Sequence, residues 1–287
     1  MPNLPKTVRY GFFRILMNRT VQKALLPFGH DLKPDKWVFV LGCYNSATTL
    51  LASILRKHPL LGGLPNEGAF LTDALPYPEL FGWPRMWSQC LEQMNMDSGL
   101  DNARLERRIK KHWSLWFPKN TPILIEKSIS NITRTDFLQE YFNPAYFIYI
   151  VRNGFVVSKG IQKKANYARW NCPYKENGYP IELCAEQWKT SDEIFSSARS
   201  RLKNVIEITY EDFTEEPLNT LRSITDFLKI PPISEEVMNR QWSVHELTST
   251  IKNMNSTGLS RLNKEDYAKI KSVAGDVLKK YGYDHAA

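Results

Sequence analysis

Hydrophobic positions along the chain fall into short runs that alternate with longer stretches of helical spacing. Four runs rich in Val, Ile, Phe and Tyr have the length and near-continuous apolar character of strands buried on both faces. Between and after them, apolar residues recur every three to four positions, as in amphipathic helices. The predicted strands are Trp37–Gly42, Ile123–Glu126, Tyr146–Val151 and Val205–Thr209, and the predicted helices are Ala47–Lys57, Asn102–His112, Arg134–Tyr141, Phe155–Ala165, Ile181–Arg201, Pro217–Leu228 and Lys264–Tyr281.

This order of elements predicts an α/β fold. Strands that alternate with helices form βαβ units, so we expect a central, mostly parallel sheet with helices on both faces. The chain has no internal repeat and no low-complexity linker, which favours one domain over residues 1–287. A further candidate strand lies within Leu64–Leu80, in a loop otherwise interrupted by Pro and Gly.

Two segments lie outside this pattern. Residues 1–35 contain YGFFRILMNRTVQKALL, a helical extension with basic residues between apolar ones, which we expect to pack on its own domain rather than on a membrane surface. Residues 76–118 form an insertion of loop and basic helix. Its aromatic residues suit a lid or a wall around an acceptor, and packing of the insertion onto the sheet explains them equally well. Its four tryptophans are Trp83, Trp87, Trp113 and Trp116.

Composition and charge narrow the class of protein. The 287 residues are 43% hydrophobic and 24% charged, which is ordinary for a folded soluble protein. No apolar run is long enough to span a membrane and the start lacks a secretory signal, so we expect a cytoplasmic protein. The net charge of +8 favours anionic partners without choosing among them. The four cysteines lack metal-binding spacing, so we expect buried free thiols and no metal.

The segment WVFVLGCYNSATTLL carries the most informative chemistry. A buried strand ends at Gly42, a tight turn follows, and a helix begins near Thr48. The free N–H groups and dipole of that helix predict an anion site at Ser46–Thr49, where Ser46, Thr48 and Thr49 add hydroxyl donors. The GxxxxGK[ST] loop of nucleoside triphosphatases is missing, which argues for a phosphate not held by a metal.

The other predicted strands also end on residues suited to an anionic nucleotide. Lys127, Arg152 and Tyr210 each follow a strand directly, and Ser158 follows Arg152 by six positions. Ligands of open parallel sheets bind beyond the carboxyl ends of the strands, so these side chains are expected to converge on the turn.

Together these motifs resemble the sulfotransferases that use 3′-phosphoadenosine 5′-phosphosulfate (PAPS), particularly the bacterial, glycan-modifying and tyrosyl-protein branch. That family has a G-x-x-x-S-G-T-T-L-L turn, and this chain has GCYNSATTLL. EKSISN, IYIVRNGFVVS and TYEDFTEEPLNTLRSITDFL match later family motifs in order, over residues 36 to 285. The resemblance implies a P-loop-like sulfotransferase fold.

The resemblance also implies roles for individual residues. Lys127 would lie beside the bridging oxygen or the sulfuryl group, and Glu67 falls where the tyrosyl-protein branch has its catalytic glutamate, although a capping or surface carboxylate is the simpler interpretation of Glu67. The implied nucleotide contacts are Asn45, Ser46, Ala47, Thr48 and Thr49 with the 5′-phosphosulfate, Arg152 and Ser158 with the 3′-phosphate, Tyr210 with the adenosine side, and Ser256 and Arg261 in the late NSTGLSR loop.

Three positions depart from the family pattern. Ala47 replaces the usual Gly, so its backbone must avoid a positive φ or tolerate strain. Asn45 replaces a Lys or Arg that often contacts the leaving phosphate. Ser158 follows Arg152 more closely than in much of the family, and Gly160 stands at the longer family spacing.

The predicted reaction is transfer of a sulfuryl group to a hydroxyl or amine of a small-molecule or carbohydrate acceptor, with Lys127 and the Ser46–Thr49 amides stabilising the leaving oxygen and Glu67 as base. Alternatives are a kinase-like nucleotide enzyme, a basic protein that binds nucleic acid or an acidic surface, and a sulfotransferase fold without catalysis. We expect no nucleic-acid partner, because the run Arg104–Lys111 is typical of a solvated helix face. Neither the acceptor nor the oligomeric state follows from the sequence.

Overall fold

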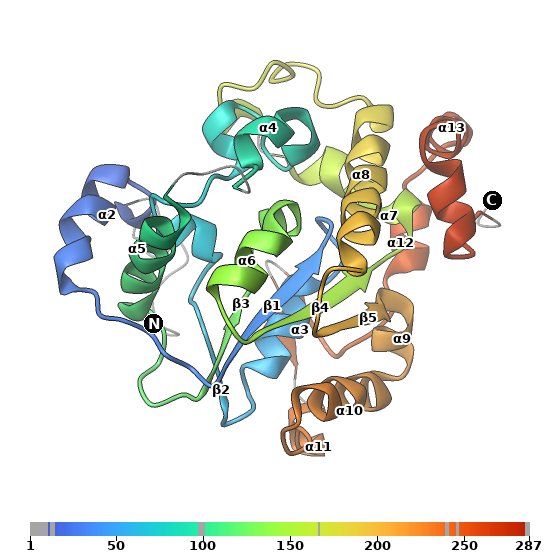
Figure 1. Cartoon of the computed structure of the whole chain (residues 1–287). Coiled ribbons are helices and arrows are strands. Elements are labelled where there is room, and N and C mark those ends of the chain that lie inside the picture. Colours follow the sequence, from blue (N-terminus) through green and yellow to red (C-terminus); the bar gives the residue numbers. More distant parts are fainter. Residues whose placement is uncertain are drawn as a thin grey trace.

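A five-stranded parallel sheet forms the centre of the structure, in the order β2-β3-β1-β4-β5 (Figure 1). The computed structural model describes residues 11, 15–96, 101–165, 167–238, 241–244 and 247–284. The predicted α/β fold with a parallel sheet is confirmed. The strands are β1 (Lys36–Gly42), β2 (Leu61–Gly63), β3 (Ile123–Glu126), β4 (Ala145–Val151) and β5 (Val205–Thr209).

The sheet is buried on both faces because side chains of a strand alternate between the two faces. On β1, Trp37, Phe39 and Leu41 join one hydrophobic cluster, and Val38 and Val40 join the other. Trp37, Phe39 and Phe147 make an aromatic layer on the first face, with Phe39 and Phe147 stacked at 5.7 Å between ring centroids. This double burial explains why the strands are continuous apolar runs.

Helices cover each face. Side chains of α5, α6, α7, α8 and α13 contribute to the cluster that contains Trp37, and those of α3, α9 and α10 to the cluster that contains Val38. The principal helices are α3 (Thr48–Leu55), α5 (Asn102–Ser114), α6 (Thr135–Tyr141), α7 (Gly154–Lys164), α8 (Ile181–Arg199), α9 (Tyr210–Glu215), α10 (Pro217–Leu228) and α13 (Lys264–Lys280); the shorter ones are α2 (Arg19–Leu25), α4 (Leu91–Met94), α11 (Glu235–Met238) and α12 (Asn255–Leu259).

The strands that follow β1 in the chain lie on both sides of it, with β2 and β3 on one side and β4 and β5 on the other. The chain leaves β1 toward the β3–β2 side of the sheet and returns to β4 on the other side. A crevice forms where neighbouring connections diverge in this way, at the carboxyl ends of the strands. In Figure 1 the arrowheads of β1 and β4 point toward α7 and α12, so these helices stand beside that edge.

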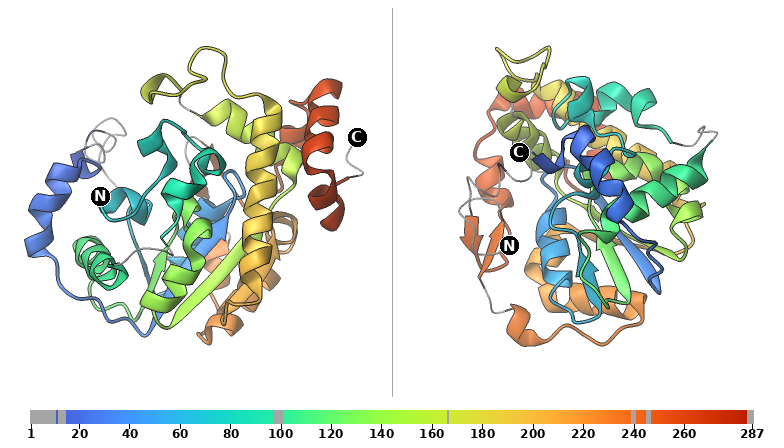
Figure 2. Two further views of the ribbon diagram at one scale, coloured as in Figure 1. Left: turned by 45° about the horizontal axis from the view of Figure 1, so that its top comes forward. Right: turned by 90° about the vertical axis from the view of Figure 1, so that its left-hand side faces the viewer.

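Two predicted boundaries are wrong. The additional strand is Leu61–Gly63, which lies just before the predicted Leu64–Leu80 segment, and that segment instead contains the 3₁₀ helices Gly68–Leu71 and Pro78–Phe81. The helix after the first strand begins at Thr48 rather than at Ala47, because Ala47 has a left-handed conformation. Outside the main sheet, the β6 (Trp242–Val244) and β7 (Leu247–Ser249) hairpin lies beside α3 (Figure 2).

The N-terminal extension is described in part. Residues 1–10 and 12–14 lie outside the described residues. Within α2, the Gln22 side chain is buried and donates to the Phe70 carbonyl at 2.9 Å, so this described portion packs on the rest of the protein. Among the described residues, no helix has both the length and the apolar character needed to cross a membrane.

The aromatic insertion packs in the interior through two of its four tryptophans. Trp87 and Trp113 are fully buried, whereas Trp83 lies parallel to Tyr179 at 6.4 Å between centroids. Its basic helix is partly held by the protein itself, since Arg108 makes two 2.6 Å hydrogen bonds with Asp73. Packing therefore accounts for Trp87 and Trp113, one of the two interpretations of the insertion.

Candidate active site

The turn between β1 and α3 is shaped by close backbone approach. Gly42 has φ 153°, and a Cβ there would lie 2.5 Å from the Ile150 carbonyl oxygen on neighbouring β4, so only glycine fits. Asn45 and Ala47 have φ of 63° and 67°. An L-residue in this left-handed region is strained by about 1–2 kcal/mol. Ala47 therefore tolerates strain where the family resemblance has glycine.

Two polar atoms in this turn are buried without a hydrogen-bond partner among the described residues: Ser46 Oγ and Asn45 Nδ2. Ser46 has no exposed surface. Leaving a buried donor without a partner costs about 1–3 kcal/mol. The N-terminus of α3 follows at once, and its first N–H groups have no acceptor within the helix. The turn therefore presents several donors without a partner, an arrangement that matches a ligand with several acceptor oxygens, such as a phosphate.

Lys127 and Glu67 form an ion pair at the end of β3. The distance between Lys127 Nζ and Glu67 Oε1 is 2.6 Å, and the side chains are 14% and 20% exposed. Glu67 comes from the loop after β2, the strand next to β3. The two predicted catalytic residues thus contact each other, and both remain accessible to a ligand.

The loop that carries Glu67 is fixed from three sides. Gly68 N donates to Glu126 Oε1 at 2.7 Å, and Ala69 N donates to Ser128 Oγ at 3.0 Å. Trp113 Nε1 donates to the Gly68 carbonyl at 3.0 Å. A Cβ at Gly68 would lie 2.6 Å from the Trp113 ring, so this packing requires glycine. The insertion therefore contributes a positioning contact next to Glu67.

Two further carboxyl groups, those of Glu126 and Glu79, interact electrostatically with Glu67 of the Lys127–Glu67 pair. Glu126 is 1% exposed, and burial raises the pKa of its carboxyl although Ser128 and Gly68 donate hydrogen bonds to it. Burial raises the pKa of Glu79 to about 7, and the charge of Glu67 contributes in the same direction. The Glu79 carboxyl is therefore mostly protonated at pH values below about 7.

Arg152 links the ends of β4 and β1 to a distant segment of the chain. Its Nη1 donates to the Asn45 carbonyl at 2.8 Å, and its Nε donates to Asn255 Oδ1 at 2.8 Å. Its guanidinium lies 3.8 Å from the centroid of the Tyr210 ring, a cation–π contact. Burial lowers the pKa of Arg152, and the neighbouring Tyr210 and Glu211 partly offset this effect.

The segment that begins at Asn255 is held in place by residues after β5. Asn255 Nδ2 donates to Glu211 Oε1 at 2.5 Å, and Met254 N donates to the Tyr210 hydroxyl at 2.9 Å. Tyr283, near the end of the described chain, donates to Glu211 Oε2 at 2.7 Å. These contacts bring α12 beside Arg152.

Residues 38–235, well over half of the chain, match the profile of the sulfotransferase family. The chain belongs to the sulfotransferase family. No curated protein sequence matches it closely enough to count as a relative.

Solved sulfotransferases share the fold. STF9 from Mycobacterium avium has a TM-score of 0.53 at 14% identity, covering 93% of this chain and 81% of its own. STF1 from Mycobacterium tuberculosis H37Rv has a TM-score of 0.52 at 15% identity, covering 80% and 78%. The sulfotransferase domain of the curacin biosynthetic pathway has a TM-score of 0.50 at 17% identity, covering 88% and 99%. At these identities the similarity concerns the P-loop-like fold alone.

The structure places the other residues that the family resemblance suggests in different surroundings. Ser158 has no exposed surface, and its hydroxyl donates to the Gly154 carbonyl within α7 at 2.7 Å. Its side chain is therefore not directed at Arg152. Gly160, at the longer spacing, is the α7 residue that faces the turn, since a Cβ there would lie 2.9 Å from the Asn45 side chain. Ser256 and Arg261 are exposed, in α12 and just after it.

Several residues of the site escaped the sequence analysis. Asn255 lies in the NSTGLSR segment already singled out, but only the fold brings it to Arg152. Glu211 directly follows Tyr210, but the same short segment also contains Asp212, Glu215 and Glu216, and the sequence does not distinguish among these carboxyl groups. Glu126 could have been recognised, because a charged residue inside a fully buried strand normally has a specific partner.

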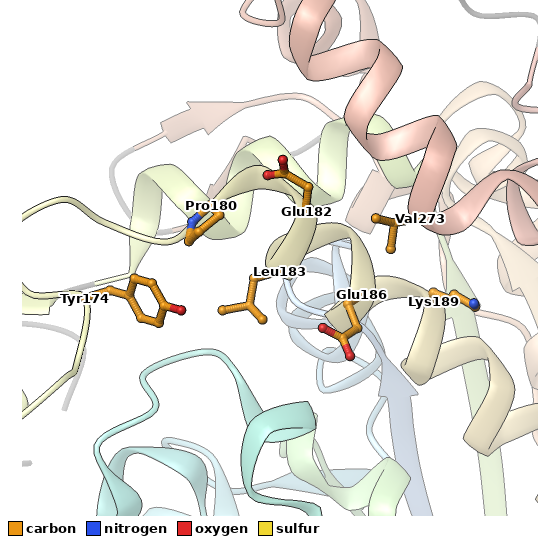
Figure 3. Close-up of a pocket in the computed structure, with 7 residues that line it drawn as sticks. All are labelled: Tyr174, Pro180, Glu182, Leu183, Glu186, Lys189 and Val273. Carbon is orange, nitrogen blue, oxygen red and sulfur yellow. The ribbon is translucent and has the colours of Figure 1, made fainter.

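Features away from the strand ends are distinct from this site. A groove of about 450 Å³ lies between the start of α8, the loop before it and α13 (Figure 3). It shares no residue with the site. The residues that line the groove are Tyr174, Pro180, Glu182, Leu183, Glu186, Lys189 and Val273.

The cysteines form no disulfide bond. All four are buried and free, as predicted. Among the described residues, no group of three or more His, Cys, Asp or Glu side chains is arranged to hold a metal ion.

Proposed function

We propose that this member of the sulfotransferase family transfers the sulfuryl group of PAPS to a hydroxyl group of a small-molecule or carbohydrate acceptor. The observation that carries the proposal is the convergence of three features at adjacent strand ends. They are the Asn45–Thr49 turn after β1, the Lys127–Glu67 pair after β3, and Arg152 with Tyr210 after β4 and β5.

The chemistry of these residues fits a nucleotide with two phosphate positions. Ser46 Oγ and the first N–H groups of α3 offer donors without a protein acceptor, as a 5′-phosphosulfate requires. Arg152 donates to the Asn45 carbonyl of the turn and presents a planar guanidinium, which suits a second phosphate. No GK[ST] lysine follows the turn, so the usual contact with a β- or γ-phosphate is missing.

PAPS would supply a sulfuryl group joined to the nucleotide through an oxygen that becomes a good leaving group once its charge is stabilised. Lys127, which follows β3 and contacts Glu67, is the cation that the family resemblance assigns to that oxygen. Glu67 accepts the proton of the acceptor hydroxyl as the acceptor oxygen forms its bond to sulfur and the bond between sulfur and the bridging oxygen breaks. A donor that stabilises a leaving oxygen, as proposed for Lys127, raises the rate about 10²–10³-fold, and a general base, as proposed for Glu67, raises it about 10²–10⁴-fold.

Transfer of labelled sulfate tests the proposal directly. The purified chain is incubated with PAPS labelled in its sulfuryl group and with a panel of neutral sugars, phenols, aliphatic alcohols and amines. We expect label in a hydroxyl-bearing acceptor, release of 3′,5′-adenosine bisphosphate and loss of both in Glu67→Gln. Hydrolysis of Mg²⁺–ATP with phosphate transfer, and no sulfate transfer to any acceptor, would contradict it.

A further inference from the structure

One face of α7 lies against the turn after β1. A Cβ at Gly160 would be 2.9 Å from both Cγ and Nδ2 of Asn45, so α7 approaches this side chain as closely as only glycine allows. Residues four apart lie on the same helix face. Val156, one turn earlier, packs on Gly258 of α12, where a Cβ would lie 2.4 Å from Val156 Cγ1. Lys164, one turn later on the same face, is the last residue of α7.

The Asn45 side chain is held in place and has an unused donor. Its backbone has φ 63°, a conformation that asparagine tolerates better than most residues, and its carbonyl accepts from Arg152. Its Nδ2 is buried and has no hydrogen-bond partner among the described residues. An acceptor atom from a ligand would satisfy it.

Positive charge gathers at the same place. Burial lowers the pKa of the Lys164 ammonium, and the charges of Arg85, Arg152 and Arg261 lower it further. The Lys164 side chain nevertheless retains exposed surface. Cations from the insertion, the end of β4 and the segment after α12 therefore all act on Lys164, and a multiply charged anion beside Lys164 would relieve this repulsion.

Resting on the proposed function, we propose that Asn45 Nδ2 and Lys164 Nζ bind the 3′-phosphate of the nucleotide beside Arg152. For Asn45 this replaces the 5′-phosphosulfate contact that the family resemblance implies, because its side chain faces α7 and its carbonyl accepts from Arg152. Gly160 makes this possible because it leaves room for the asparagine side chain. A hydroxyl on α7, which the family resemblance suggests at the Gly160 position, is thereby replaced by an amide from the turn. Asn45 and Gly160 therefore depend on each other, because a side chain at position 160 would collide with the Asn45 amide.

Calorimetric titration with 3′,5′-adenosine bisphosphate and with adenosine 5′-phosphate tests the assignment. We expect Asn45→Ala and Lys164→Ala each to weaken binding of the bisphosphate about 10-fold or more and to change binding of the monophosphate less than about 2-fold, the effect of losing one hydrogen bond to a charged group. Lys163→Ala is the matched control, because Lys163 neighbours Lys164 in sequence but points from a different face of α7, and it should change neither affinity.

The pairing is tested by exchanging both residues. Gly160→Ser should weaken bisphosphate binding, since its side chain collides with Asn45, and Asn45→Ala/Gly160→Ser should recover affinity relative to either single variant. Thermal unfolding of each variant identifies any that fail to fold, and the exposed Lys164 keeps the test decisive in that case. If Asn45→Ala and Lys164→Ala both discriminate between the two nucleotides as well as wild type does, this inference is wrong and the proposed function is unaffected. A wild-type chain that binds neither nucleotide overturns the proposed function as well.

Discussion

At the residue scale, the contact between Lys127 and Glu67 joins the two groups on which the proposed chemistry depends. We predict that Lys127→Ala lowers turnover of labelled sulfate by about 10²–10³, because a preorganised charge near the leaving oxygen acts mainly in the transition state. Calorimetry should find nucleotide affinity within a few-fold of wild type. Lys127→Arg is the charge-conserving control. Turnover of Lys127→Ala close to that of wild type would remove this residue from the mechanism.

Ala47 shows how a single residue can store strain at a binding turn. Its φ of 67° costs an L-residue about 1–2 kcal/mol, and glycine relieves this cost but loses about 0.5–1 kcal/mol through backbone entropy. We therefore predict that Ala47→Gly raises the free energy of unfolding by up to about 1 kcal/mol, measured by urea denaturation, and preserves nucleotide binding. A decrease in the free energy of unfolding would contradict this account of the turn.

At the scale of elements, four of the five sheet strands were predictable, and the order in which they pair was not. Ile123–Glu126 has the predicted bounds because it is a short run buried on both faces. Val205–Thr209 also has the predicted bounds, but it is a half-buried edge strand with Glu207 exposed, and its β-branched residues carry the strand signal. The strand β2 was missed since Leu61–Gly63 is three residues long and contains two glycines. Such an edge strand is defined by its pairing with β3 rather than by its own sequence.

The loop after β2 depends on packing from the insertion, and Gly68 is its tightest point. We predict that Gly68→Ala lowers both the free energy of unfolding, by about 1–3 kcal/mol for overpacking, and turnover, because the added Cβ displaces Glu67 from Lys127. Gly275→Ala is the matched control, since a Cβ there has no heavy atom within 4 Å. A turnover of Gly68→Ala equal to that of the control would show that this packing does not position Glu67.

At the scale of the whole molecule, the sequence indicated which strand ends carry the candidate site residues but not how their side chains contact one another. Lys127 and Arg152 were predictable because each directly follows a buried strand, and parallel strands end at the same edge. The Asn255–Arg152 contact joins residues 103 positions apart, and no local pattern reports it. The family resemblance implied a role for the Ser158 hydroxyl, and only the fold shows that this hydroxyl donates to Gly154 within α7 and that Gly160 faces Asn45.

The buried carboxyl groups make stability depend on pH in a defined direction. Burial raises the pKa of Glu79 from 4.5 to about 7, so the folded state retains a proton that the unfolded state releases between these values. The free energy of unfolding should therefore fall as pH rises from about 4.5 to 7, by at most about 3 kcal/mol from this group, and then level off. Glu126 contributes in the same direction.

Glu79→Gln isolates this contribution. Urea denaturation between pH 4.5 and 8 should find the variant increasingly more stable than wild type up to about pH 7, with a constant difference above it. Parallel profiles for the variant and wild type over this range would contradict the assignment to Glu79.

The central claim is that the ends of neighbouring strands hold one nucleotide with two phosphate positions. Its most direct test is calorimetric titration of wild type and Arg152→Ala with 3′,5′-adenosine bisphosphate and with adenosine 5′-phosphate. The account predicts that wild type binds the bisphosphate at least about 10-fold more tightly and that Arg152→Ala binds both with similar affinity. Equal affinities in wild type, or full discrimination in the variant, would contradict it.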